Sequence, residues 1–223
     1  MIDGVKVIGA RGRVGSAIGA RLARRGLLDD GPAPGLVLLC VPDRTIAEVA
    51  AGIEAGPWVA HLSGGTPLAA LAPHDRRFSL HPLQTFTLDR GAEQLDGAWG
   101  AVSGESAEAT AAGTWLAESL GLKPFVLEDD ARALYHAGAA VASNYLVTLR
   151  RIAGELLTYA DVPSEALDPL MRRVVENGFQ LTGPIERGDW ETVERHRTVI
   201  AARAPELLDA YDTLARLTAR MTS

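Results

Sequence analysis

The stretch Val7-Ile8-Gly9-Ala10-Arg11-Gly12-Arg13-Val14-Gly15 joins a short apolar run to the start of a helical pattern. Glycines in such a turn let the backbone approach a pyrophosphate closely, and the helix that follows offers unpaired N–H groups and a positive dipole end. The stretch therefore predicts a strand–turn–helix unit that binds phosphate. Its spacing, Gly-x-x-Gly-x-x-Gly, differs from the common Gly-x-Gly-x-x-Gly. The alternative is a tight turn that packs helix against strand without a ligand.

Strand-like and helix-like segments alternate on both sides of this turn as far as Glu128, which is typical of a parallel α/β sheet. The expected strands span 5–8, 36–41, 58–62, 78–81, 98–102 and 124–127, and the expected helices span 14–25, 45–53 and 106–120. Helical periodicity then covers 130–158, 164–181 and 190–221, with Gly183-Pro184 as the expected stop of the middle segment. The sequence predicts an α/β, Rossmann-like, mostly parallel sheet over residues 1–128 and an all-helical domain over 129–223.

One element of a dinucleotide-binding fold is missing from this pattern. The strand that normally follows the first helix ends in the residue that binds the adenosine ribose. Here residues 27–35 contain two prolines and two glycines, which do not form a central strand. Asp29 or Asp30 would be left to reach the ribose. We therefore expect a sheet without its usual second strand, and the choice between NAD and NADP stays open.

Composition narrows the class of protein. The chain has 223 residues, 47% hydrophobic and 22% charged, with a net charge of −6. An acidic chain is a poor non-specific binder of nucleic acid, so no nucleic-acid partner is expected. The single cysteine, Cys40, allows no intrachain disulfide. No apolar run reaches the length of a membrane span, and the first residues lack the pattern of a signal peptide. We expect a cytoplasmic protein with no membrane partner and no metal site.

Residues that could contact a ligand lie at the ends of three of the expected strands, at the edge where ligands bind in open α/β sheets. Val41-Pro42 follows one strand, and we expect it to contact the cofactor. The Ser63 hydroxyl follows the next and is expected to face a nicotinamide or a substrate, although a simple turn is the alternative. His81 ends a further strand and, with Gln84 and Thr85, is expected to contact substrate. For His81 the alternative is a structural histidine.

Three polar residues lie among small ones on the helical segment 130–144: His136, Ser143 and Asn144. At 100° per residue, Ser143 is about 20° and Asn144 about 80° from His136, so all three are expected to face one cleft. A histidine suits the proton donor that carbonyl reduction requires. Asn144 would orient the carbonyl or hold the nicotinamide amide. The alternative is a polar cluster that packs the domains together.

These expectations define three groups of residues. The predicted cofactor-binding residues are Gly9, Ala10, Arg11, Gly12, Arg13, Val14, Gly15, Val41 and Pro42. The predicted catalytic residues are His136, Asn144 and Ser63, and the predicted substrate-binding residues are His81, Gln84, Thr85 and Ser143.

Several motifs together resemble the Rossmann-like proteins that carry the C-terminal domain of unknown function 2520. Besides the glycine turn, the matching segments are Leu38-Leu39-Cys40-Val41-Pro42-Asp43, His61-Leu62-Ser63-Gly64, His81-Pro82-Leu83-Gln84-Thr85-Phe86, Tyr135-His136-Ala137 through Ser143-Asn144-Tyr145, and Leu181-Thr182-Gly183-Pro184 with Arg187-Gly188-Asp189. That family is similar to the 6-phosphogluconate dehydrogenase-like group, which includes ketopantoate reductase. The resemblance implies NADP-dependent reduction, a homodimer formed through the helical domain, and a small 2-keto acid such as ketopantoate as substrate. In the wider group a helical lysine often acts as the acid, and His136 is the expected substitute here.

Two functions remain open from the sequence. The first is an NAD(P)-dependent reductase of a small 2-keto acid or imine, with NADP or NAD as cofactor. The second is a dimeric, non-catalytic protein that binds a nucleotide or metabolite on a degenerate Rossmann scaffold. The polar residues favour the first, and the shortened segment 26–35 favours the second.

Overall fold

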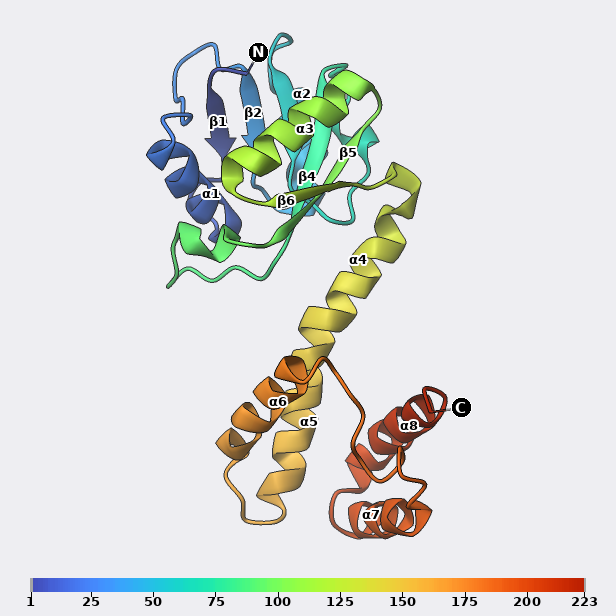
Figure 1. Ribbon diagram of the computed structural model, residues 1–223. Coiled ribbons are helices and arrows are strands. Elements are labelled where there is room, and N and C mark those ends of the chain that lie inside the picture. Colours follow the sequence, from blue (N-terminus) through green and yellow to red (C-terminus); the bar gives the residue numbers. More distant parts are fainter. Residues whose placement is uncertain (1, 223) are drawn as a thin grey trace. The chain divides into compact units, whose positions relative to one another are not determined.

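The computed structural model describes residues 2–222, which form two compact units that divide between Val141 and Ala142 (Figure 1). The first unit contains a sheet of six strands: β1 (Val5–Ile8), β2 (Leu36–Leu39), β3 (Trp58–His61), β4 (Arg77–Leu83), β5 (Trp99–Gly104) and β6 (Lys123–Val126). Its helices are α1 (Arg13–Arg24), α2 (Ile46–Ala51), α3 (Ala107–Leu120) and α4 (Arg132–Ala140). The sequence predicted a domain boundary near Glu128, which lies before α4. In the structure α4 belongs to the first unit.

The strands lie in the order β1-β2-β3-β4-β5-β6. Neighbours from β1 to β4 are parallel, β4 and β5 are antiparallel, and β5 and β6 are parallel. The predicted Rossmann-like, mostly parallel sheet is therefore confirmed. Since successive parallel strands follow one another along the chain, their carboxyl ends share one edge of the sheet.

Helices cover both faces of the sheet, as expected where strands are apolar on both sides. On one face, Ile18 and Leu22 of α1 and Leu116 of α3 pack with Leu38 of β2 and Phe78 of β4. On the other face, Ile46 and Ala50 of α2 pack with Val37, Leu39 and Val59. Side chains alternate along a strand, so His61, Ser79 and His81 lie on the α2 face, opposite Ala60, Phe78 and Leu80.

The missing second strand is confirmed, and the structure shows what replaces it. After α1, a single parallel bridge pairs Leu28 with Val5, the first residue of β1. The N–H of Val5 donates to the Leu27 carbonyl at 2.8 Å, and the N–H of Asp29 donates to the Val5 carbonyl at 3.0 Å. The chain then crosses to the other side of Val5, where Leu36 begins β2. The usual strand is reduced to one bridge at the amino end of β1.

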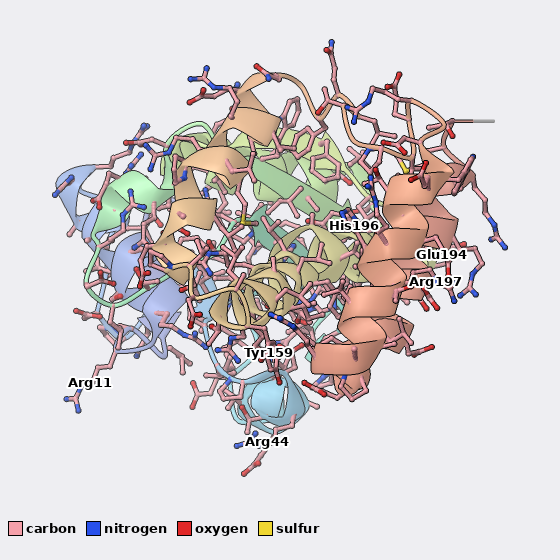
Figure 2. The ribbon with its side chains drawn as sticks, turned by 90° about the horizontal axis from the view of Figure 1, so that it is seen from below. Arg11, Arg44, Tyr159, Glu194, His196 and Arg197 are labelled. Carbon is pink, nitrogen blue, oxygen red and sulfur yellow. The ribbon has the colours of Figure 1, made fainter. Side chains whose placement is uncertain are left out.

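The second unit contains α5 (Leu146–Thr158), α6 (Leu167–Glu176), α7 (Trp190–Arg203) and α8 (Leu208–Ala219). Side chains of α7 and α8 join the two helices. Arg197, labelled in Figure 2, pairs with Asp212 at 2.7 Å, and His196 lies 2.9 Å from the Tyr211 hydroxyl. None of the described helices is both long and apolar enough to cross a membrane.

Two helix boundaries predicted for this unit were wrong. The segment expected to be helical over 164–181 ends at Glu176, because Gly178 at φ +68° stops it before Gly183-Pro184 is reached. The segment expected to be helical over 190–221 is interrupted at Ala204-Pro205, where proline supplies no N–H to continue the helix. The apolar spacing continues on both sides of each break, so periodicity alone predicted uninterrupted helices.

Candidate functional site

The glycine turn lies at the carboxyl edge of the sheet, pressed against the end of β2. Gly9 has φ +90°, and a Cβ there would lie 2.3 Å from the Cys40 carbonyl oxygen. A Cβ on Gly15 would lie 2.3 Å from the Gly9 carbonyl oxygen. Glycine is thus required at both positions, because any side chain would overlap the backbone. The close fit brings the start of α1 directly beside the segment that follows β2.

The first turn of α1 offers hydrogen-bond donors without protein acceptors. The N–H of Ser16 donates to the Gly12 carbonyl at 2.9 Å, so the N–H groups of Arg13, Val14 and Gly15 precede the first intrahelical bond. In the described chain no side chain caps α1, and its first turn has no acidic residue. An anion at this position would satisfy these donors and interact favourably with the helix dipole.

Exposed arginines lie in the segment that follows β2 and on this turn. Arg11 and Arg13 are exposed on it, and Arg44 is exposed in the turn before α2. The Arg11 and Arg44 side chains project outward in Figure 2. Val41 lies against the turn, since its Cγ1 is 3.4 Å from the position of a Gly9 Cβ, and Pro42 beside it is exposed. The structure therefore brings the predicted cofactor-binding residues together.

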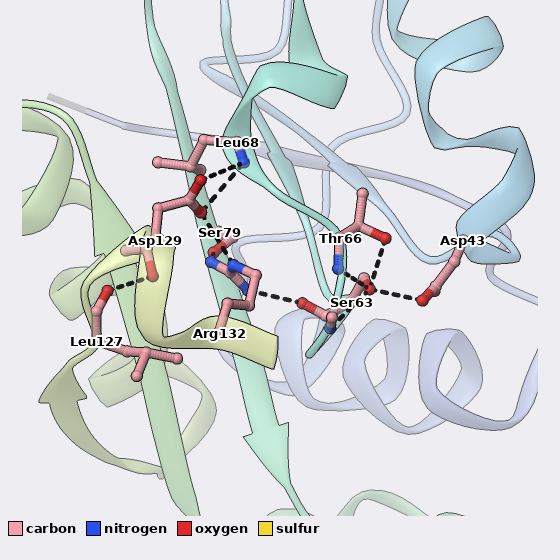
Figure 3. A network of polar contacts seen from close by, with 10 residues as sticks. Asp43, Ser63, Thr66, Leu68, Ser79, Leu127, Asp129 and Arg132 are labelled. Carbon is pink, nitrogen blue, oxygen red and sulfur yellow. Dashed lines mark hydrogen bonds and ion pairs between the residues drawn. The ribbon is translucent and has the colours of Figure 1, made fainter. Parts of the chain in front are cut away.

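Ser63 lies at the centre of a polar network that follows β3 (Figure 3). Its hydroxyl is 2.7 Å from Asp43 Oδ2 and 2.8 Å from Thr66 Oγ1, and it accepts the N–H groups of Gly65 at 3.2 Å and Thr66 at 2.9 Å. These contacts use the hydrogen-bonding capacity of the hydroxyl within the protein. Ser63 therefore fixes the loop after β3 against the segment after β2.

Arg132, at the start of α4, is 2% exposed and extends the same network (Figure 3). It donates to the Ser63 carbonyl at 3.0 Å and to the Ser79 hydroxyl, and it pairs with Asp129 at 2.9 Å. Asp129 also accepts the N–H of Leu68, at 3.2 Å from each carboxylate oxygen. A buried charge requires such partners to offset its desolvation. The pair therefore fixes the start of α4 to the loop after β3 and to Ser79 within β4.

His81 and His136 meet beside Gly64. The Nδ1 atom of His81 is 2.7 Å from the Tyr135 hydroxyl, and the rings of His81 and His136 lie edge to face, 6.0 Å apart. A Cβ on Gly64 would lie 2.8 Å from Cδ2 of His136 and 2.9 Å from Nε2 of His81. Only glycine leaves space for both imidazoles, and His136 is exposed while His81 is partly buried.

Burial controls protonation in this cluster. The pKa of His81 is lowered to about 4 by desolvation, then by the neighbouring His136 and Arg132. The pKa of the fully buried His61 is lowered to about 4, mainly by desolvation and then by Arg132. The pKa of Tyr135 is raised to about 12 by burial, so its hydroxyl keeps its proton. At neutral pH, His81 is therefore an uncharged imidazole beside an O–H group.

Four further residues were predicted for the site. Gln84 and Thr85 are exposed after β4, where Oε1 of Gln84 accepts the N–H of Thr85 at 2.9 Å. Ser143 and Asn144 belong to the second unit, within a π-helical segment, Val141–Tyr145. Hydrogen bonds in a π-helix span five residues, so the assumption of 100° per residue from His136 onward was wrong. The catalytic role of Asn144 and the substrate-binding roles of Gln84, Thr85 and Ser143 stay predictions.

The sequence analysis missed Arg132 and Tyr135 as residues of this site. With His136 they occupy positions i, i+3 and i+4 of α4, which share one face of a helix. That spacing was the available signal. The prediction instead joined His136 to residues farther along the segment. Asp43 was also missed, since only its distance of 2.7 Å from Ser63 reveals its place in the network.

The fold is shared with several solved structures. A candidate NADP oxidoreductase from Bacteroides fragilis is 20% identical over 98% of both chains, with a TM-score of 0.80. A protein from Thermotoga maritima is 24% identical over 98% of this chain and 97% of its own, with a TM-score of 0.80. A reductive aminase from Aspergillus terreus, solved with NADPH and ethyl levulinate, is 18% identical over 99% of this chain and 95% of its own, with a TM-score of 0.65.

Sequence comparison gives a second result. No curated protein matches the sequence. The family model for the domain of unknown function DUF2520 matches residues 98–218, which is more than half of the chain. The protein therefore belongs to the DUF2520 family, as its motifs predicted.

Proposed function

We propose that this protein is an NAD(P)-dependent oxidoreductase that reduces a small 2-keto acid or imine. The observation that carries the proposal is the position of two features at one edge of the sheet. The unpaired N–H groups of α1 lie beside the end of β2, and the paired imidazoles of His81 and His136 lie beside Gly64, just after β3. The network of Asp43 and Ser63 connects the loops between them.

The residues at this edge fit a nicotinamide dinucleotide. The turn has no side chain at Gly9, Gly12 or Gly15, and the donors of α1 match a pyrophosphate. Val41 and Pro42 would contact the cofactor beyond the pyrophosphate. When bound, the cofactor supplies a hydride to the substrate. The Bacteroides fragilis and Aspergillus terreus proteins of similar fold support this assignment, since the first is a candidate NADP oxidoreductase and the second was solved with NADPH.

His136 is the group we assign as proton donor to the carbonyl or imine. It is exposed beside Gly64, whereas the lowered pKa of His81 keeps that imidazole uncharged at neutral pH. We assign the Tyr135 hydroxyl, 2.7 Å away, as the donor to Nδ1 of His81, so that the proton of this uncharged imidazole lies on Nε2, beside Gly64. Nε2–H then donates to the substrate oxygen or nitrogen. In this scheme Ser63 positions its loop, and Gln84 and Thr85 complete substrate binding.

We also propose that the protein is a homodimer formed through its second unit. Among the described residues of that unit, the buried hydrophobic side chains are Val193, Ile200, Ala204 and Leu207. Large apolar side chains of α6 stay exposed, including Leu170 at 60% and Val175 at 55%. A surface of this kind is typical of a helical interface between subunits.

Nucleotide titration tests the cofactor assignment. We expect NADPH or NADH to bind wild-type protein and to bind Arg13→Asp roughly 30-fold more weakly, because the new carboxylate occupies the donors of α1 and repels phosphate. An acidic residue in the first turn favours the helix, so the variant should keep its thermal stability. Arg151→Asp, on α5, carries the same change of charge and should bind like wild type. Absence of NADPH and NADH binding at millimolar concentration would overturn the proposal.

The second candidate function is a non-catalytic nucleotide-binding protein. The reduction of the second strand to a single bridge at Leu28 favours it. The two functions differ in one observable: the reductase oxidises NAD(P)H when a small 2-keto acid or imine is added, whereas the binding protein binds the nucleotide and leaves it reduced.

A further inference from the structure

The segment that replaces the second strand pairs with the amino end of β1, at the end of the strand opposite the glycine turn. Oδ1 of Asp29 accepts the N–H of Gly31 at 2.8 Å. A Cβ on Gly4 would lie 2.6 Å from Oδ2 of Asp29, so this carboxylate packs against the residue just before β1. Asp29 is thus held in a turn at the amino edge of the sheet.

The distance from this turn to the candidate cofactor site is about the length of β1. Four residues of strand rise by about 13 Å between Val5 and Gly9. In a complete dinucleotide-binding fold, the second strand runs along β1 to the carboxyl edge, where its last residue binds the adenosine ribose. Here the bridge covers only Val5, and the chain turns back to begin β2 at Leu36. Asp29 and its turn therefore cannot serve as the ribose-binding residue.

We infer that this site recognises the nicotinamide and phosphate portions of its cofactor and gives little binding energy to the adenosine portion. The inference rests on the proposed function. What remains at the carboxyl edge is the first turn of α1, the glycine turn with Arg11 and Arg13, and Val41 with Pro42. These groups contact phosphate and the ribose nearest the nicotinamide. The segment around Leu28, which would flank the adenosine in a complete fold, pairs only with the amino end of β1.

The test compares NADH with reduced nicotinamide mononucleotide, which lacks the AMP portion but keeps one phosphate. Calorimetric titration of the full chain should give dissociation constants for the two ligands within about tenfold of each other. Millimolar adenosine should not displace reduced nicotinamide mononucleotide. A mononucleotide that binds more than 100-fold more weakly than NADH, or displacement by adenosine, would overturn the inference and leave the proposed function intact. Failure of both ligands to bind would instead overturn the proposed function.

A conservative variant gives an independent result. Asp29→Asn keeps the Oδ1 acceptor for the N–H of Gly31 and removes the charge that binds a ribose in complete folds. We expect NADH to bind this variant within twofold of wild type. A loss of tenfold or more for NADH, with no loss for reduced nicotinamide mononucleotide, would show that Asp29 contacts the adenosine ribose and would contradict the inference.

Discussion

The two units of the chain leave different kinds of groups without partners. In the first unit both faces of the sheet are covered by apolar side chains, and the N–H donors of α1 and the exposed imidazole of His136 are available to a ligand, beside exposed apolar side chains such as Leu134. In the second unit large apolar side chains are exposed on α6, such as Leu170 and Val174. Unused donors indicate a small polar ligand, and unburied apolar side chains indicate a protein partner. The comparison is the basis on which we propose chemistry in the first unit and assembly through the second.

The largest effect should come from placing a charge on the exposed apolar surface of α6. Leu170→Asp removes a side chain worth about 2 kcal/mol of burial, and a two-fold symmetric dimer loses it twice. We expect dimerisation to weaken by roughly 1000-fold, measured by sedimentation or light scattering over a range of concentrations. Arg172→Asp, on the same helix, should stay dimeric. A wild-type chain that is monomeric at high micromolar concentration would contradict this half of the comparison.

The next effect concerns catalysis in the first unit. His136→Ala should lower kcat by roughly 100-fold, the usual contribution of a general acid, and leave NAD(P)H affinity and dimerisation unchanged. His196→Ala in α7 removes another exposed histidine and serves as the control, with kcat close to wild type. Equal turnover of His136→Ala and wild type would remove His136 from the proposed mechanism.

Acid should destabilise the first unit through its buried histidines. The pKa of His61 is about 4 in the folded protein, below its ordinary value of 6.5, so the unfolded chain takes up the proton first as the pH falls. The free energy of unfolding therefore falls as the pH is lowered from 6.5 to 4. Between pH 7 and 4.5, His61 accounts for a loss of about 2 kcal/mol. Urea unfolding at these two pH values measures it.

For each variant, the free energy of unfolding at pH 4.5 is compared with its own value at pH 7. His61→Gln should lose about 2 kcal/mol less than wild type between pH 7 and 4.5, whereas His196→Gln should lose as much as wild type. Identical losses in wild type and His61→Gln would contradict the assignment of acid sensitivity to His61.

A smaller effect is expected at Tyr135, which positions His81. Tyr135→Phe removes the hydroxyl 2.7 Å from Nδ1 and should lower kcat by roughly tenfold, the value of one hydrogen bond. Because the imidazole would then lose its preferred tautomer, the pH profile of kcat should change while NAD(P)H affinity does not. An unchanged pH profile and kcat would show that the contact only packs the two rings together.

The sequence predicted local elements better than contacts between them. The six strands are short apolar runs with polar ends, and the glycine turn follows from the spacing of Gly9, Gly12 and Gly15. The bridge at Leu28 was not predicted because its partner, Val5, lies on another element and residues 27–35 have no strand pattern of their own. The helix end near Gly178 was missed because Gly183-Pro184 was the stronger stop signal.

The candidate site was predicted only in part, because some of its contacts join different elements of the fold. His81 and His136 were identified from their positions on a strand end and a helix, and the structure brings them together at Gly64. The Arg132–Asp129 pair depends on contacts with Ser63, Ser79 and Leu68, which come from three other segments. No sequence pattern specifies such contacts, because they arise only when the start of α4 packs against the sheet.

The central claim is that a nicotinamide nucleotide binds at the carboxyl edge of the first unit. Amide chemical shifts of isotope-labelled protein, recorded during titration with NADPH, test it most directly. We expect the largest changes at Arg13, Val14 and Gly15, with further changes at Val41 and Gly64. Shift changes confined to another surface, such as the 590 Å³ cavity beside Lys6 and Pro34, would contradict it.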